Sequence, residues 1–180
     1  VYSNTNIKCH EKCKNLKPLN FYGKNKLIIE KNVKKILPKR HIILRLSNIL
    51  YDKINIKKDV FYYQLLKSLK KKNIIQFDFD CKTYKDFITP LYFSKCIDKL
   101  ILSNNIGTFN LCSGHSLKIY DLAVQIIKGY QAGKIVFSGI KENESFFMCN
   151  KKLKKTLHIT LSLSNIKKYL IYMGKKLKHA

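Results

Sequence analysis

Short β-branched runs alternate with longer segments of helical periodicity, and this alternation constrains the fold more than any other feature of the sequence. Apolar residues recur at helical spacing through residues 20–35, and the run 41–46 that follows is typical of a buried strand. The same pattern predicts helices over residues 60–69, 93–102, 117–130 and 164–174, and strands over residues 74–79, 107–112 and 134–137. Helices and strands in alternation predict an α/β fold with a parallel sheet.

Capping residues mark the ends of two predicted helices. Asn20 precedes the first helical segment and is a suitable N-cap, and Pro38 closes that segment. Ser116 is the expected N-cap of the segment that runs to about Tyr130. These signals divide the chain into elements without a Pro-, Gly- or Ser-rich linker between two separate domains.

The net charge of +25 is the most extreme number in the composition. All but two of the 36 basic residues are lysines, the exceptions being Arg40 and Arg45. Proteins that read nucleic acid usually depend on arginine for bidentate contacts, and the chain is also rich in Asn and Ile, as expected from AT-rich codons. We therefore attribute the high positive charge mainly to the lysine enrichment that AT-rich codons produce, rather than to a binding function. Binding of nucleic acid, an anionic membrane surface or a phosphorylated ligand remains the alternative.

The cysteines and the apolar runs exclude several classes of protein. No apolar run approaches the roughly 20 residues of a membrane-spanning helix. Four of the six cysteines are scattered in apolar or mixed sequence, which is typical of reduced, packed thiols. Cys9 and Cys13 form a close pair, but a zinc site needs four ligands and no second pair follows. We therefore expect no metal.

Tyr22 and Lys26 form the sharpest chemical feature of the sequence. Residues four apart in a helix lie on one face, one turn from each other. A lysine ammonium beside a phenol stabilises the phenolate, so a tyrosine in this position can act as a general acid or base. An ordinary amphipathic helix with solvated lysines is the alternative, because a lysine-rich chain contains such pairs by chance.

Five segments resemble the landmarks of one enzyme family, in the same order and at similar spacing. Residues 18–30 are similar to Pro-x-x-x-Tyr-Gly-x-Ser-Lys followed by apolar residues and Glu. Residues 1–3 resemble Val-Tyr-Gly, 44–51 resemble Leu-Arg-x-x-Asn-Val-Tyr-Gly, 85–88 resemble Arg-Asp-Phe-Ile, and 107–123 resemble Gly-x-Tyr-Asn-Val-Gly-x-Gly followed by Ser and Asp-Leu-Ala. The family is that of the extended short-chain dehydrogenases, the NAD-dependent epimerases and dehydratases of sugar nucleotides.

The resemblance implies roles for five matched side chains. Tyr22 would be the catalytic acid or base, and Lys26 would bind the nicotinamide ribose of NAD or NADP and stabilise the Tyr22 phenolate. Ser47 would contact the same cofactor. Asn48 would contact the diphosphate region of a nucleoside-diphosphate sugar, and Lys85 stands where an arginine reaches the nucleotide or its phosphates. A turn-forming asparagine and a surface lysine are the alternatives at the last two positions.

The resemblance also implies a domain organisation. We expect the C-terminal portion of a Rossmann-type doubly wound parallel sheet together with a smaller α/β substrate-binding region. Residues 1–58 would form the second half of the dinucleotide-binding domain, and residues 59–180 mainly the substrate-binding region, interleaved with it. The glycine loop that binds the pyrophosphate and the catalytic Ser or Thr are expected before Val1, so we expect this chain alone to be inactive. Residues 89–92 depart from the family, which has Val-Asp-Asp there.

The leading functional hypothesis is an NAD(P)-dependent enzyme of nucleotide-sugar metabolism, such as one that supplies polysaccharide biosynthesis. An epimerase is favoured over a reductase or a dehydratase, because the Arg-x-x-Asn and Asp-Phe-Ile landmarks are common in epimerases. We expect a cytoplasmic protein with neither nucleic acid nor membrane as its partner. The family resemblance implies a homodimer through the helix of residues 22–35, with Leu27, Ile28 and Val33 facing the partner.

Two other functions remain open. One is a catalytically inactive relative of the dehydrogenases that acts only through protein interactions. The other is a basic nucleic-acid-binding module, which would need lysines concentrated on one face and aromatic side chains exposed for stacking.

Overall fold

The computed structural model describes residues 8–13, 16, 18, 20–51, 61–80, 82–141 and 145–179. The landmark at residues 1–3 and the predicted domain border at residues 58 and 59 lie outside this part of the chain. Within it, helices and strands alternate as the sequence predicts, and parallel strand pairs dominate.

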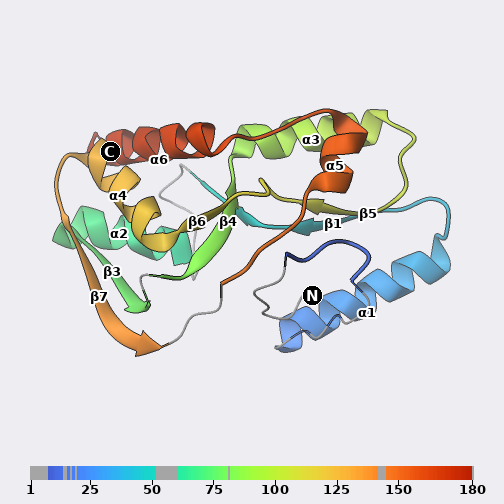
Figure 1. Cartoon of the computed structure of the whole chain (residues 1–180), viewed down its shortest axis with the longest axis horizontal. Coiled ribbons are helices and arrows are strands. Elements are labelled where there is room, and N and C mark those ends of the chain that lie inside the picture. Colours follow the sequence, from blue (N-terminus) through green and yellow to red (C-terminus); the bar gives the residue numbers. More distant parts are fainter. Residues whose placement is uncertain are drawn as a thin grey trace.

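Three small sheets form the centre of the described chain (Figure 1). Strand β1 (Ile42–Leu46) pairs in parallel with β5 (Gly107–Leu111). Strand β2 (Asn48–Ile49) pairs in parallel with β4 (Tyr84–Ile88), which pairs antiparallel with β6 (Ser116–Lys118). Strand β3 (Ile74–Phe79) pairs in parallel with β7 (Lys134–Lys141). The turn between β1 and β2 is a single residue, so these two strands lead the chain directly from one sheet into the next.

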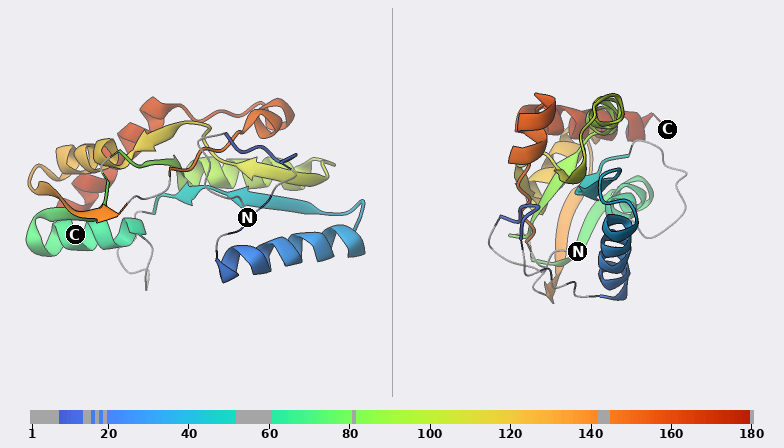
Figure 2. Two further views of the ribbon diagram at one scale, coloured as in Figure 1. Left: turned by 60° about the horizontal axis from the view of Figure 1, so that its bottom comes forward. Right: turned by 90° about the vertical axis from the view of Figure 1, so that its right-hand side faces the viewer.

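Helices cover the β1–β5 sheet on both sides (Figures 1 and 2). Helix α1 (Phe21–Ile36) lies on one side, and α3 (Pro90–Leu102) and α5 (Lys151–Leu157) lie on the other. Helices α2 (Phe61–Lys72), α4 (Ile119–Tyr130) and α6 (Leu163–Lys178) gather around the β3–β7 and β4–β6 strands. No helix among the described residues is both long and apolar enough to cross a membrane.

The buried core joins all three sheets. Its fully buried phenylalanines, Phe77, Phe87 and Phe109, come from β3, β4 and β5. Helix α5 is tied to this core by Lys152, whose Nζ donates to the Thr108 carbonyl at 2.7 Å and lies 4.0 Å from the centroid of the Phe109 ring. Burial lowers the pKa of this ammonium. The core therefore extends from the β1–β5 sheet to α3 and α5, whereas α1 contributes no apolar side chain to it.

Local signals predicted helix α1 correctly at both ends. The Asn20 side chain accepts a hydrogen bond from the Gly23 amide at 2.8 Å, which is the expected N-cap contact. The helix ends at Ile36, because Pro38 restricts the residue before it to extended conformations. The five cysteines that the structure describes are free, and three of them, Cys9, Cys96 and Cys112, are buried.

Two helix starts differ by two or more residues from the sequence prediction. Ser116 is not an N-cap but the first residue of β6, since residues 116–118 pair with β4 and the helix begins only at Ile119. Helix α3 begins at Pro90 rather than at residue 93. There Thr89 is the N-cap and accepts from the Tyr92 amide at 3.3 Å, and a proline at the first helical position costs no hydrogen bond.

Three short elements were missed because they carry little periodicity. Strand β2 has two residues, and the interior of β4 contains Lys85 and Asp86, which strands disfavour. Helix α5 has only seven residues, four of them lysines. Helix α6 also starts earlier than predicted, at Leu163, because Ser162 accepts from the Asn165 amide at 3.1 Å and caps it.

Candidate functional site

A cavity of about 390 Å³ lies between α1 and β1. Tyr22 and Lys26 line it from the first turns of α1, and both side chains are exposed, Tyr22 to 71%. The Lys26 Nζ lies 5.4 Å from the centroid of the Tyr22 ring. The structure therefore brings the predicted pair together at an accessible surface, as helical spacing requires.

The rest of the cavity wall is mainly apolar. It comes from α1, from β1 and from the segment before α5, with the following members: Ile29, Glu30, Val33, Ile43, Leu44, Arg45, Leu46, Phe146 and Met148. A phenol and an ammonium on an apolar wall can orient a ligand that combines a flat apolar ring with hydroxyl groups.

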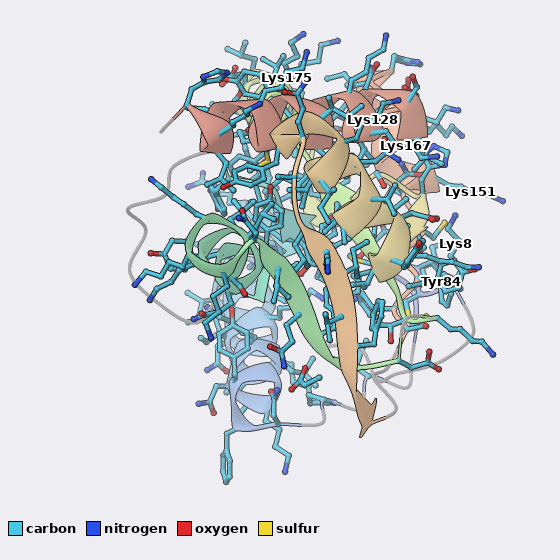
Figure 3. All side chains as sticks on the ribbon, turned by 90° about the vertical axis from the view of Figure 1, so that its left-hand side faces the viewer. Lys8, Tyr84, Lys128, Lys151, Lys167 and Lys175 are labelled. Atoms are coloured by element: carbon cyan, nitrogen blue, oxygen red, sulfur yellow. The ribbon has the colours of Figure 1, made fainter. Side chains whose placement is uncertain are left out.

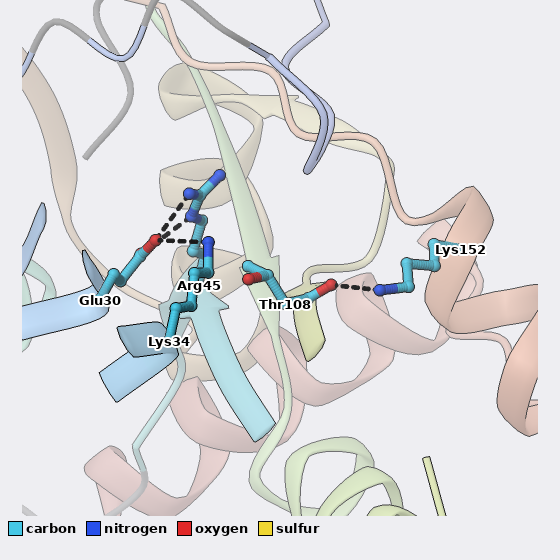
Figure 4. Close-up of polar contacts among 5 residues, drawn as sticks. All are labelled: Glu30, Lys34, Arg45, Thr108 and Lys152. Carbon is cyan, nitrogen blue, oxygen red and sulfur yellow. Dashed lines mark hydrogen bonds and ion pairs between the residues drawn. The ribbon is translucent and has the colours of Figure 1, made fainter. Parts of the chain in front are cut away.

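A buried ion pair joins the two elements that form this cavity. Arg45 on β1 donates from Nε to Glu30 Oε1 at 2.9 Å and from Nη2 to Oε2 at 2.7 Å (Figure 4). The two side chains are only 5% and 8% exposed, and Lys34 approaches the same carboxylate at 4.0 Å from the outside. Because Glu30 follows Lys26 by one helical turn, this contact lies one turn beyond the Tyr22–Lys26 pair on the same side of the helix.

Ser47 is the single residue between β1 and β2, Asn48 is the first residue of β2, and neither lines the cavity. Ser47 is buried, and its hydroxyl has no partner at hydrogen-bonding distance among the described residues. It lies close to the Asp86 carboxylate, and this proximity acts to lower the pKa of that group. Asn48 is exposed, and its Nδ2 donates to the Asp86 carbonyl at 3.0 Å.

Asp86 holds the loop that follows β5. Its carboxylate accepts from the Ser113 amide, the Ser113 hydroxyl and the Gly114 amide, each at 2.9 Å. Burial raises the pKa of this fully buried group, and the hydrogen bonds from Ser113 and Gly114 oppose that shift. Lys85 precedes it on β4, half-buried and paired in register with Leu117. The structure thus links Asn48 to β4 through the Asp86 carbonyl, while Lys85 lies outside the cavity of Tyr22.

Asn110 joins two distant segments behind the cavity. Its side-chain Nδ2 donates to the carbonyls of Cys9 and Cys149 at 3.1 Å each. Its backbone N–H donates to Glu11 Oε1 at 2.9 Å. The backbones of Cys9 and Met148 also form an isolated parallel β-bridge. These contacts fix residues 145–149, two of which line the cavity.

Sequence reasoning matched Glu30, Arg45, Asp86 and Asn110 to family landmarks but gave them no role. A usable signal was present. The last three each stand next to large apolar residues in a short strand, as Arg45 does in Ile-Ile-Leu-Arg-Leu. A polar group at a buried strand position must find a partner, so such positions mark tertiary contacts.

The lysines are not confined to one side of the described chain. Figure 3 shows Lys128, Lys151, Lys167 and Lys175 on α4, α5 and α6. Exposed lysines also follow α1 and the last turn of α2, which lie elsewhere on the molecule. Within the described part of the chain, the exposed lysines are therefore spread over several helices rather than gathered on one.

Comparison with solved structures shows the class of fold. The UDP-N-acetylglucosamine 4-epimerase from Methanobrevibacter ruminantium M1, in complex with UDP-N-acetylmuramic acid, has a TM-score of 0.81 at 16% identity over 97% of this chain and 58% of that one. RMD from Pseudomonas aeruginosa, complexed with NADPH, has a TM-score of 0.77 at 18% identity over 97% and 61%. The dTDP-glucose 4,6-dehydratase from Bacillus anthracis, in complex with NAD, has a TM-score of 0.76 at 14% identity over 97% and 58%.

These likenesses confirm the predicted Rossmann-type α/β fold. The chain spans 58 to 61% of the length of these three structures. The family model described as the RmlD substrate binding domain matches residues 1–176, and the chain belongs to this family. The match confirms the resemblance to the extended short-chain dehydrogenases that the sequence landmarks indicated. No curated protein matches the chain.

Proposed function

We propose that the complete protein is an NAD(P)-dependent enzyme that acts on a nucleoside-diphosphate sugar, with Tyr22 as its acid–base residue. The observation that carries this proposal is the exposed Tyr22–Lys26 pair on the cavity between α1 and β1. Three similar folds belong to enzymes named for sugar nucleotides or complexed with NADPH or NAD. An epimerase is the first candidate reaction, followed by a reductase and a dehydratase.

The residues around the cavity fit a nicotinamide cofactor, either NAD or NADP. The Lys26 ammonium can donate to ribose hydroxyls, and the Tyr22 hydroxyl is exposed beside it. Ile29, Val33 and Leu44 supply an apolar surface for a flat ring. When bound, the nicotinamide supplies the hydride chemistry.

The chain's own residues would handle the proton and the substrate. Tyr22 exchanges a proton with the sugar oxygen at the carbon that is oxidised or reduced, and Lys26 stabilises its phenolate by charge. Ser47, although buried, would contact the cofactor. Asn48 and Lys85, on the paired strands β2 and β4, would hold the diphosphate part of the substrate.

Substitution of the pair in the complete protein tests this proposal. UDP-, dTDP- and ADP-linked sugars would be incubated with NAD or NADP, and the sugar products identified by chromatography. We expect Tyr22→Phe to lower kcat by about 10²- to 10⁴-fold, because the proton-transfer group is lost. Lys26→Met should lower kcat and also weaken cofactor binding, measured by nicotinamide fluorescence.

Lys24→Met is the matched control, since Lys24 is an exposed lysine on the same helix that does not line the cavity, and its Nζ lies 5.5 Å from the centroid of the exposed Phe21 ring. It should leave the reaction unchanged. Full turnover by Tyr22→Phe would rule out the proposed acid–base role and would favour a relative that acts through protein interactions.

We further propose that the complete protein is cytoplasmic and homodimeric. The free thiols of the five described cysteines fit a reducing compartment. Of the residues expected to face a partner, Ile28 is 55% exposed, and Leu27 and Val33 are half-buried, with Val33 also lining the cavity. Ile36, 74% exposed on α1, extends the apolar surface around Ile28.

A further inference from the structure

Helix α1 has little buried surface with which to fix its own position. Among its 16 residues, the buried ones are Gly23 and Glu30. The apolar side chains Ile28, Ile29 and Ile36 are all more than half exposed. The orientation of Tyr22 and Lys26 therefore depends strongly on how Glu30 is held.

The contact that holds Glu30 fixes an angle as well as a distance. Two nitrogens of the Arg45 guanidinium donate to the two carboxylate oxygens at 2.9 and 2.7 Å, so two planar groups meet through a pair of hydrogen bonds (Figure 4). An apolar contact would allow the helix to roll or tilt on β1. A bidentate contact between nearly buried groups resists both motions.

Small movements at Glu30 would be amplified at Tyr22. The two residues are eight positions apart, which is about 12 Å along a helix axis at 1.5 Å per residue. A tilt of about 10° at Glu30 would therefore move Tyr22 by about 2 Å. A displacement of about 1 Å at a reacting group can cost about 10²-fold in rate.

Stability alone does not account for a charged pair at this place. Removing two charges from water is costly, and apolar residues of similar volume often stabilise a protein equally well. We propose that Glu30 and Arg45 are positioning residues that set the placement of the Tyr22–Lys26 pair relative to β1, and thereby the rate of the reaction. This inference rests on the proposed function.

The double variant Glu30→Met/Arg45→Met in the complete protein separates positioning from stability. It replaces the ion pair by two apolar side chains, so we expect a melting temperature close to that of the unmodified protein. We expect kcat to fall about 10- to 100-fold. The KM for the sugar nucleotide should change little, because the residues proposed to bind it lie on β2 and β4. Amide hydrogen exchange along α1 should accelerate, since the helix is no longer fixed to β1.

Arg45→Lys is the second variant, because it keeps the charge and loses the bidentate geometry. We expect an intermediate loss of kcat, and this variant decides the question if the double variant does not fold. Lys34→Met is the matched control, since it removes only the outer contact at 4.0 Å from a side chain that is 44% exposed. It should preserve both kcat and exchange along α1.

The outcomes distinguish this inference from the proposed function. A double variant with unchanged kcat and unchanged exchange along α1 would overturn the positioning role. If Tyr22→Phe retained full turnover while the double variant still showed faster exchange along α1, the proposed acid–base role would fail, but Glu30 and Arg45 would remain the residues that place the helix.

Discussion

Individual polar residues on the short strands of this protein hold neighbouring helix and loop segments in place. Arg45, Asp86 and Asn110 each lie in a different strand, are nearly or fully buried, and bond to segments distant in sequence. Buried polar groups are tolerated only when hydrogen-bonded. These three residues therefore specify partners that apolar packing alone would leave undefined.

Replacing Asp86 by Asn tests the most central of these contacts. The carboxylate accepts three hydrogen bonds through two oxygens, whereas an amide would turn its NH₂ group toward at least one donor. We expect Asp86→Asn to lower the free energy of unfolding by about 1–3 kcal/mol near neutral pH, measured by urea denaturation. Asp98→Asn, at an exposed carboxylate on α3, is the control and should have little effect.

The same substitution should show a defined pH dependence. Burial raises the pKa of Asp86, so between its ordinary value and the raised one the folded state binds more protons than the unfolded state. The contribution of this group to stability is therefore fully present below the ordinary pKa and is lost as the pH rises through the raised one. The stability difference between the unmodified protein and Asp86→Asn should grow on acidification. A difference that shrinks instead would contradict the assigned shift.

At the scale of elements, two glycines permit a close approach of helices α4 and α6. Helices α4 and α6 cross where a Cβ at Gly129 would collide with the Ile171 carbonyl and a Cβ at Gly174 with the Ile126 carbonyl. Any larger residue would force the two helices apart. The α4–α6 crossing thus requires that the residues at positions 129 and 174 have no side chain.

Alanine at either glycine should therefore destabilise the protein, although alanine favours a helix by about 1 kcal/mol relative to glycine. We expect Gly129→Ala and Gly174→Ala each to lower stability by about 1–3 kcal/mol, seen as a fall in Tm by differential scanning calorimetry. Lys128→Ala, one residue away on the exposed face of α4, serves as the control. A rise in Tm for both glycine variants would show that the crossing can relax without cost.

At the scale of the whole molecule, the exposed apolar residues of α1 indicate a surface at which a second copy of the protein can bind. Exposed apolar side chains gathered on one helix mark interaction sites more often than isolated ones do. We expect the complete protein to be a dimer in light scattering, and Ile28→Lys together with Ile36→Lys to shift it toward the monomer. Leu91→Lys, at a side chain on α3 that is 64% exposed, should leave the assembly unchanged. A monomeric unmodified protein would refute the proposed dimer.

The sequence by itself determined the features that depend on neighbouring residues. Helical spacing placed Tyr22 and Lys26 on one face, and Asn20 and Pro38 set the ends of α1, because caps and i,i+4 contacts are local. The order of the landmarks identified the family. It also pointed to segments that contain Arg45, Asp86 and Asn110, without saying what these side chains contact.

Only the tertiary structure decided those contacts. Glu30 and Arg45 are 15 residues apart, Asp86 and Ser113 are 27 apart, and Asn110 and Cys9 are 101 apart. The two-residue strand β2 exists only because β4 lies beside it. Partners so distant are chosen when burial removes water as the alternative hydrogen-bonding partner, and no local pattern in the sequence records which segment will replace it.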